Sequence, residues 1–324
     1  MKAVVWTAYG PPDVLQLREV ARPVPRDHGL LVAVRSTTVT AGEVELRRFR
    51  FWSVVTVPLR LYIGLFRPRG ERIPGQEFAG DVVAVGDAVT RFEVGDRVCA
   101  HAGFGFGGYG EYATVGESGT VASIPEGVSY EDATTLPTAG LYANHFVTRA
   151  APGPGQSVLI NGGGGSIGSF AIQLARRTGA EVTAVDRTDK LAIMTSLGAN
   201  HVIDYTERDF TKNLSAYDSI LDVVDKSNFH RAAPSLKPGG TYLHSNLSLF
   251  RLLQSKLSRY RRDRHSRYVS EGETRDALNS LLGMVANGEL EVAIDRRYAL
   301  EEIADAHEYA ETGQKRGHIV IQVN

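Results

Sequence analysis

Three glycines have the spacing of a loop that binds a dinucleotide. Gly162, Gly165 and Gly168 follow an apolar run from Ser157 to Ile160 and precede a segment whose apolar residues recur at helical spacing. Glycines there let the chain turn tightly and bring a pyrophosphate against bare N–H groups at the helix start. A strand, a helix and a further strand accompany the glycines, so the pattern indicates a dinucleotide site rather than an ordinary turn.

An acidic residue follows the loop at the distance expected for ribose recognition. Asp186 ends the next strand, where a carboxylate accepts hydrogen bonds from both ribose hydroxyls of NAD and repels a 2′-phosphate. Arg187 and Lys190 lie next to it and could instead bind that phosphate. A helix-capping or surface acid is the alternative for Asp186. We expect NAD(P)H as cofactor, with NADH favoured over NADPH.

The elements around this loop predict an α/β fold. From residue 157 apolar strands ("SVLI", "EVTAV", "HVID", "SILDVV", "TYLH") alternate with helical patterns, which predicts a doubly wound parallel sheet. Residues 1–125 instead alternate short strand patterns with Gly/Pro turns, as in a compact β-rich domain. The last sixty or so residues predict a helix, a strand "EVAID", another helix and a final strand "HIVIQV".

Composition points to small-molecule partners. The 324 residues are 43% hydrophobic and carry a net charge of −1, so there is no overall attraction for nucleic acid or an anionic membrane. The only cysteine, Cys99, is expected in the core, and it excludes an internal disulfide or a multi-cysteine zinc site. The N-terminus lacks a signal-peptide pattern, which predicts a cytoplasmic location.

Two further segments have competing interpretations. Residues 51–66 are apolar but short for a membrane span and interrupted by Pro58 and Arg60, so we expect a buried or substrate-facing element, with membrane or partner contact as the alternative. The basic stretch 255–268 is interpreted as the solvated face of an amphipathic helix rather than a nucleic-acid site.

The order of motifs along the whole chain resembles a known superfamily. "GQEFAGDVVAVG", "FEVGDRV", "GGYGEYATV", "LPTAGLYA", the glycine loop, "LGANHVIDY" and the C-terminal "LEEIADAHEYAETGQKRGHIVIQV" resemble the medium-chain dehydrogenase/reductase superfamily, and within it the zinc-independent quinone oxidoreductase-like enzymes. The resemblance implies a GroES-like catalytic domain formed by residues 1–125 and 268–324, a Rossmann domain over 126–267, an active site in the cleft and a homodimer.

The same resemblance predicts that no metal is bound. In zinc-dependent relatives two cysteines and the histidine of "GHE" hold the catalytic metal, and the matching positions here are Thr40, Gln76 and Thr138. Neutral hydroxyl and amide groups are poor zinc ligands, and Glu77 alone cannot restore the site. No histidine has the spacing of a metal motif.

Without a metal, an activated alkene is the natural hydride acceptor. No Tyr-x-x-x-Lys pair is present to protonate a simple ketone. In an activated alkene the negative charge collects on a conjugated oxygen, which uncharged hydrogen-bond donors can stabilise, here Thr40, Gln76 and Thr138. A quinone or an α,β-unsaturated carbonyl is therefore expected. Tyr62 is a candidate proton donor or stacking wall, with a packed aromatic as the alternative. Glu43 either orients the loop through hydrogen bonds or faces solvent.

Further cofactor contacts are implied by similarity. Backbone N–H groups of Ser166 and Ile167 are expected at the pyrophosphate and Tyr205 near the adenosine side. The strand ends carrying Val224, Asp225, Ser245 and Asn246 are expected to face the nicotinamide half.

Two other functions fit the same motifs. One is a specialised biosynthetic reductase or oxidase with a bulky apolar substrate, which would suit the aromatic segment 51–66. The other is a dinucleotide-binding protein without catalytic activity that serves structural or regulatory interaction.

Overall fold

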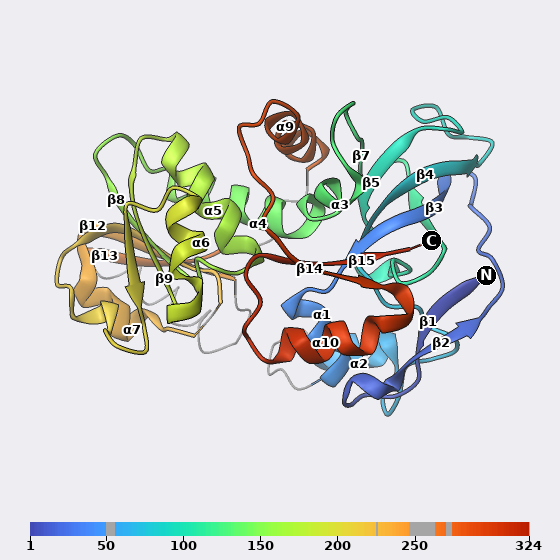
Figure 1. Ribbon diagram of the computed structural model, residues 1–324, viewed down its shortest axis with the longest axis horizontal. Coiled ribbons are helices and arrows are strands. Elements are labelled where there is room, and N and C mark those ends of the chain that lie inside the picture. The colour runs from blue at the N-terminus through green and yellow to red at the C-terminus, as the bar shows by residue number, and fades with distance from the viewer. Residues whose placement is uncertain (50–55, 225, 246–262, 270–273, 324) are drawn as a thin grey trace. The chain divides into compact units, whose positions relative to one another are not determined.

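The computed structural model describes the chain except residues 50–55, 225, 246–262, 270–273 and 324 (Figure 1). It divides into two compact units. Among the described residues, unit 1 contains 1–49, 56–141 and 274–323, and unit 2 contains 142–269. This division keeps residues 126–141 in unit 1, whereas the sequence analysis assigns them to the Rossmann domain.

Unit 1 is built on a seven-stranded sheet in the order β14-β15-β3-β4-β5-β7, with β6 also paired to β3. Its strand pairs are antiparallel except β14 with β15, which are parallel. A separate hairpin joins β1 and β2. The strands are β1 (Lys2–Trp6), β2 (Leu15–Glu19), β3 (Gly29–Thr38), β4 (Glu77–Val85), β5 (Arg97–His101), β6 (Tyr112–Gly116), β7 (Thr120–Ser123), β14 (Ile294–Ala299) and β15 (His318–Gln322).

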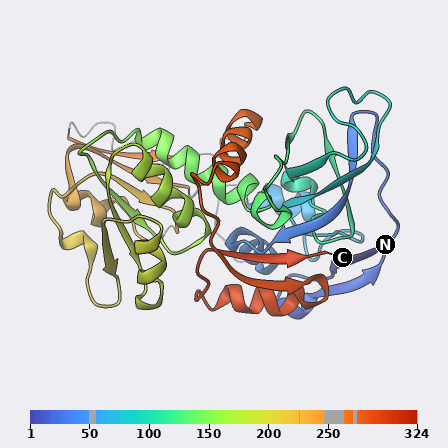
Figure 2. The same ribbon diagram turned by 45° about the horizontal axis from the view of Figure 1, so that its top comes forward.

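The helices of unit 1 lie around this sheet, and α10 packs beside α1, β14 and β15 (Figure 2). Buried apolar side chains from β1, β3, β4, α1, α10 and β15 form one continuous core. The helices are α1 (Ala41–Arg48), α2 (Thr56–Ile63), α3 (Tyr130–Ala133), α9 (Arg275–Ala286) and α10 (Ile303–Glu311), with a π-helical turn at Leu136–Gly140.

Unit 2 contains a six-stranded sheet in the order β10-β9-β8-β11-β12-β13, and all its strand pairs are parallel. This order reverses direction between β8 and β11, where doubly wound sheets bind ligands. The predicted parallel α/β sheet is therefore confirmed. The strands are β8 (Ser157–Asn161), β9 (Glu181–Asp186), β10 (His201–Asp204), β11 (Tyr217–Asp222), β12 (Leu236–His244) and β13 (Arg264–Tyr268), and the helices are α4 (Leu141–Ala150), α5 (Ser166–Arg177), α6 (Leu191–Ser196) and α7 (Phe229–Ala232).

Two local predictions were wrong. The basic segment was expected to be helical, but β13 is a strand because its backbone pairs with β12; residues 255–262 lie outside the described part of the chain. The strand expected at "EVAID" begins only at Ile294, where pairing with β15 starts.

Other expectations from the sequence can be compared with burial. Cys99 is fully buried in β5, as predicted. In α2 only Leu59 and Ile63 are buried, while Val57, Leu61 and Tyr62 are exposed, so this helix is not the wholly buried element that was one expectation. None of the helices in the described ranges has the length and apolar character needed to span a membrane.

Candidate functional site

The start of α1 is fixed by two reciprocal hydrogen bonds between Thr40 and Glu43. Thr40 Oγ1 accepts from the Glu43 backbone N–H at 3.2 Å, and Glu43 Oε2 accepts from the Thr40 N–H at 2.9 Å. This arrangement is a capping box, in which two N–H groups without helical partners are satisfied. The Thr-x-x-Glu spacing in the sequence is the local cause.

Glu43 also joins this helix start to the Gln76 loop and to Tyr109. Its Oε1 accepts from the Gln76 N–H and its Oε2 from the Tyr109 hydroxyl, both at 2.9 Å. The side chain is only 3% exposed, so the solvent-facing alternative for Glu43 was wrong. Burial, with a smaller contribution from the nearby Glu77, raises the pKa of Glu43 to about 7.

A second buried carboxylate, that of Glu77, fixes the backbone of Thr138. Glu77 Oε2 accepts from the Thr138 backbone N–H at 2.8 Å, and Glu77 Oε1 accepts from the Thr38 hydroxyl. Burial raises the pKa of Glu77, and the two hydrogen bonds oppose that shift. Because Gln76 and Glu77 are adjacent, the two carboxylates bring Thr40, Gln76 and Thr138 together within unit 1.

The site offers uncharged hydrogen-bond donors. Thr40, Gln76 and Thr138 are each partly exposed, while the Thr138 Oγ1 atom is itself buried. It makes no hydrogen bond of normal geometry in the described part of the chain, although it lies close enough to the Glu77 carboxylate to lower the pKa of that group. A buried hydroxyl without a partner carries a free-energy cost. A ligand oxygen that accepted from it after rotation of the Thr138 side chain would remove that cost.

The donors of this site do not fit zinc. Thr40, Gln76 and Thr138 supply neutral oxygen or amide groups, whereas zinc prefers thiolate, imidazole or carboxylate. The Glu43 and Glu77 oxygens already accept hydrogen bonds from the protein. Within the described ranges, no group of three His, Cys, Asp or Glu side chains could hold a metal ion.

Tyr62 lies apart from these contacts. Its hydroxyl donates to the Phe104 carbonyl at 3.2 Å, and the Arg72 guanidinium lies 4.9 Å from its ring centre. The side chain is exposed, which excludes the packed-aromatic alternative. In the part of the chain that is described, Tyr62 has no hydrogen bond to Thr40, Gln76 or Thr138.

In unit 2 the glycine loop requires small residues for distinct reasons. Gly162 has a φ of +94°, and a Cβ on it would lie 2.3 Å from Val224 Cγ1. A Cβ on Gly168 would lie 2.1 Å from the Gly162 carbonyl oxygen, so this glycine lets α5 pack against the loop. Gly165 is the N-cap of α5, which begins with Ser166 and Ile167. The loop and helix start therefore form a bare backbone cradle suited to a pyrophosphate.

Asp186 lies beside this cradle and is largely buried, so the surface-acid alternative was wrong. Its carboxylate accepts from the backbone N–H groups of Gly164 at 3.0 Å and of Arg187 at 2.9 Å. Lys190 Nζ lies 3.4 Å from Asp186 Oδ1, and this lysine is also buried. Part of the hydrogen-bonding capacity of Asp186 therefore stabilises the loop.

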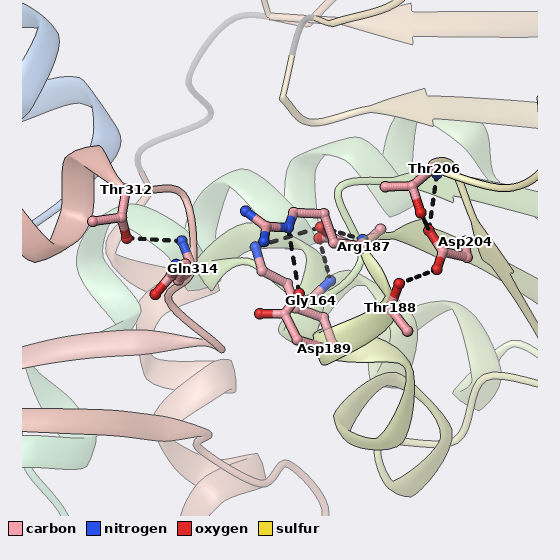
Figure 3. Close-up of polar contacts among 10 residues, drawn as sticks. Gly164, Arg187, Thr188, Asp189, Asp204, Thr206, Thr312 and Gln314 are labelled. Carbon is pink, nitrogen blue, oxygen red and sulfur yellow. Dashed lines mark hydrogen bonds and ion pairs between the residues drawn. The ribbon is translucent and has the colours of Figure 1, made fainter.

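The ends of β9 and β10 gather further polar side chains (Figure 3). Arg187 pairs with Asp189 at 3.4 Å, and the Thr188 and Thr206 hydroxyls both donate to Asp204. Tyr205 follows directly after β10 and has an exposed side chain. The predicted Arg187, Lys190 and Tyr205 are thus brought to the same edge of the sheet as Asp186.

The expected nicotinamide-side residues are only partly described. Val224 packs on Gly162 and keeps 41% of its surface exposed. Ser245 follows β12 and is partly buried. Asp225 and Asn246 lie outside the described residues.

Sequence reasoning missed several buried polar residues. Asp222, at the end of β11, accepts from Asn161 at 2.8 Å and from the Tyr242 hydroxyl at 2.5 Å. In unit 1, Tyr109 and His307 lie 3.1 Å apart next to Glu43. Asn161 and Asp222 end apolar runs at the switch point, which could have singled them out; Tyr109 and His307 carry no comparable pattern.

Two family models match the chain. Residues 26–126 match the alcohol dehydrogenase GroES-like domain, and residues 197–321 match the zinc-binding dehydrogenase model. The first match confirms the GroES-like character predicted for the N-terminal β-rich part.

Similar proteins extend over nearly the whole chain. An NADPH-dependent alkenal/one oxidoreductase of Arabidopsis thaliana chloroplasts is 28% identical, with 99% of this chain and 79% of the relative covered. A zinc-type alcohol dehydrogenase-like protein of Schizosaccharomyces pombe is 30% identical, with 78% of each chain covered. The structure of the quinone oxidoreductase from Coxiella burnetii superposes with a TM-score of 0.89 at 28% identity, covering 100% of this chain and 99% of that one.

Proposed function

Because the chain belongs to the medium-chain dehydrogenase/reductase superfamily, among relatives of the quinone oxidoreductase kind, we propose that it is an NAD(P)H-dependent reductase that transfers hydride to a quinone or an α,β-unsaturated carbonyl. One observation carries the proposal in the structure. Thr40, Gln76 and Thr138 form a cluster of uncharged donors, held by two buried carboxylates, and the Thr138 hydroxyl makes no hydrogen bond of normal geometry in the described residues.

Each residue has a part in this proposal. When bound, the nicotinamide supplies the hydride. Thr138 and Gln76 donate hydrogen bonds to the conjugated oxygen of the substrate, where negative charge collects after hydride reaches the β-carbon. Thr40 donates a proton from its hydroxyl, and Glu43 and Glu77 hold the three positions in place. Tyr62 stays a prediction as a stacking surface for the substrate.

The glycine loop and α5 start would hold the pyrophosphate through Gly162, Gly165, Gly168, Ser166 and Ile167. We propose NADH as the preferred form, because the buried Asp186 carboxylate opposes a 2′-phosphate. Lys190 already pairs with Asp186 and Arg187 with Asp189, and Arg187 is the more exposed of the two residues that could favour NADPH. Titration with NADH and NADPH, followed by nicotinamide fluorescence, measures both affinities.

We also propose that the reaction needs no zinc, on the donor chemistry of Thr40, Gln76 and Thr138. Chelator treatment of the purified protein is expected to leave activity unchanged. Stoichiometric zinc in elemental analysis would contradict this proposal.

The activity test is oxidation of NADH and NADPH with a panel of quinones, enals and enones. Thr138→Val keeps the shape of the side chain and removes its hydroxyl, so kcat/KM is expected to fall about 100-fold, as for loss of one oxyanion donor. Thr135→Val is the matched control, because among the described residues the Thr135 hydroxyl bonds only to the nearby Asp132 carbonyl. No turnover by the wild type, with tight cofactor binding, would favour a non-catalytic dinucleotide-binding protein.

A bulky apolar substrate is the second candidate. It is favoured by the exposed apolar side chains on and after α2, namely Val57, Leu61, Tyr62, Leu65 and Phe66. A polycyclic quinone in the same panel tests it, since preference for the smallest acceptors would contradict it.

We further propose a homodimer. β13 is one of the two edge strands of the unit 2 sheet within the described residues, β10 being the other, and its open side could pair with a second copy. Sedimentation of the purified protein gives the oligomeric state. The cytoplasmic location stays a prediction from the sequence.

A further inference from the structure

A narrow cavity in unit 1 lies next to Glu43. It is bordered by α1, α10, β1 and the loop before β4, with Trp6, Glu43, Arg47, Phe106 and His307 among its lining residues. The space suits a water molecule rather than a larger ligand.

The polar groups at this cavity match the hydrogen bonds of water. Arg47 is 2% exposed; its Nη2 pairs with Glu311, whereas its Nε and Nη1 atoms have no partner among the described residues. His307 is 1% exposed and its Nδ1 is likewise without a partner there. A water molecule that accepts from Arg47 and donates to His307 Nδ1 satisfies both residues.

From this cavity a line of hydrogen bonds leads to the candidate site. His307 Nε2 lies 3.1 Å from the Tyr109 hydroxyl, and that hydroxyl lies 2.9 Å from Glu43 Oε2. Glu43 Oε2 is 3.4 Å from Thr40 Oγ1, a long contact of the kind that tightens when substrate binds. All four side chains belong to unit 1.

We propose that Tyr109 and His307, with a water molecule held by Arg47, form an internal proton relay. This relay returns a proton to Glu43 and, through Glu43, to the Thr40 hydroxyl. The proposal rests on the function proposed above, because the relay serves the protonation that follows hydride transfer. Tyr109 and His307 act through Glu43 and are positioning residues rather than groups that contact substrate.

One proton moves along the relay in each turnover. Hydride adds to the β-carbon of the enone, and Thr40 gives its hydroxyl proton to the resulting enolate while it takes a proton from Glu43. Glu43 then takes the Tyr109 hydroxyl proton, Tyr109 takes the Nε2 proton of His307, and His307 takes a proton at Nδ1 from the water. One solvent proton is consumed. His307 ends as the other neutral tautomer, so it must return its Nδ1 proton to the water and regain a proton at Nε2 before the next turnover.

The electrostatics of the cluster allow this exchange near neutral pH. Burial and Arg47 lower the pKa of His307 to about 3, so the imidazole stays neutral throughout. Burial raises the pKa of Glu43 to about 7, and Glu77 contributes in the same direction. Burial and Glu43 raise the pKa of Tyr109 well above its usual value, so the phenol passes protons without ionising. Among the described residues, Asp13, Arg48 and Glu311 are further charged groups near Arg47.

The test compares Tyr109→Phe and His307→Gln with the wild type in reduction of an enone. Both variants keep the packing but interrupt proton transfer. We expect kcat to fall at least tenfold, KM for NAD(P)H to stay unchanged, and the solvent deuterium isotope effect on kcat to rise. The isotope effect from NAD(P)H deuterated at the transferred position should fall, because protonation becomes rate-limiting. A structural defect at the hydride step would not lower that effect.

Tyr309→Phe is the matched control, since Tyr309 lies on the same helix as His307 but donates to Asp295 instead. It is expected to leave kcat and both isotope effects unchanged. If the wild type turns over and Tyr109→Phe has the same kcat and isotope effects, the relay is overturned and the proposed function stands. Absence of wild-type turnover with every enone and quinone would instead overturn the proposed function, and the catalytic role of the relay with it.

A second readout needs no turnover. Infrared spectra between pH 5 and 9 should show a buried carboxyl that titrates near neutral pH, is lost in Glu43→Gln and shifts its midpoint in Tyr109→Phe. The same midpoint in Tyr109→Phe as in the wild type would overturn the hydrogen-bonded connection itself.

Discussion

The Glu77 carboxylate accepts a 2.8 Å hydrogen bond from the backbone N–H of Thr138, a residue 61 positions later in the chain. This bond ties the first residue of β4 to the π-helical turn Leu136–Gly140. Glu77 therefore fixes the backbone of Thr138, the residue that the sequence analysis matched to a cysteine ligand of zinc-dependent relatives. Its carboxylate serves to place a backbone, which is a different task from binding a metal or transferring a proton.

Glu77→Gln is expected to be tolerated. The glutamine Oε1 can accept from the Thr138 N–H, and its Nε2 can donate to Thr38, whose hydroxyl rotates to accept. Activity should stay within a few-fold of the wild type, whereas Glu77→Ala leaves the Thr138 N–H unpaired and should lower the free energy of unfolding by about 2–4 kcal/mol. Urea denaturation and steady-state kinetics check both variants. Loss of activity in a stably folded Glu77→Gln would show that the charge itself takes part in the reaction.

Stability should depend on pH through Glu43 in an unusual direction. Its pKa rises from 4.5 to about 7 on folding, so between these values the folded protein holds a proton that the unfolded chain releases. The contribution of Glu43 to the free energy of unfolding should therefore fall as pH rises from 4.5 to 7, by about 3 kcal/mol in total. Urea denaturation of the wild type and of Glu43→Gln across this range measures this contribution as the difference between the two slopes. An unchanged slope in that variant would assign it to other groups.

His307 should act in the opposite direction on the acid side. Burial lowers its pKa from 6.5 to about 3, so the unfolded chain binds the extra proton between these values. The contribution of His307 to the free energy of unfolding should fall as pH drops from 6.5 toward 3, so it opposes the Glu43 contribution between pH 4.5 and 6.5. His307→Gln should flatten this loss, while a substitution of the exposed His201 should leave it unchanged.

The glycine loop and the parallel sheet could be predicted from the sequence because their determinants are local. Gly162 needs a positive φ and Gly168 needs a bare Cα, and both requirements appear directly as glycine between a strand and a helix. The capping box is similarly local, since Thr40 and Glu43 are three residues apart. Hydrophobic alternation located most strands for the same reason.

What could not be predicted depends on contacts between distant segments. His307 and Tyr109 are 198 positions apart in the sequence, and they meet only because α10 packs beside α1. β13 was mistaken for a helix because its five residues gain their structure from pairing with β12, not from their own apolar pattern. The burial of Asp186 and Lys190 as a pair also depends on tertiary packing, although their spacing along the chain suggested a cofactor role.

Asp186→Ser should shift cofactor preference toward NADPH. The substitution removes the negative charge that opposes a 2′-phosphate and frees Lys190 from its ion pair. We expect the ratio of kcat/KM for NADPH to that for NADH to rise at least tenfold. Arg187→Ala is the companion variant and should weaken NADPH binding alone. The same ratio in Asp186→Ser as in the wild type would remove Asp186 from the ribose site.

Alanine at two loop glycines should separate folding from cofactor binding. A Cβ on Gly168 would lie 2.1 Å from the Gly162 carbonyl oxygen, so Gly168→Ala must displace the backbone and should lower the thermal unfolding temperature by several degrees. A Cβ on Gly165 meets its nearest atom at an ordinary 3.5 Å, so Gly165→Ala should fold normally. It should nevertheless weaken NAD(P)H binding at least tenfold, because the methyl group occupies the space where the pyrophosphate approaches the backbone. Gly283→Ala, in α9 with open space around its Cα, is the control for both measurements. Wild-type cofactor affinity in Gly165→Ala would mean that the pyrophosphate does not approach this part of the loop.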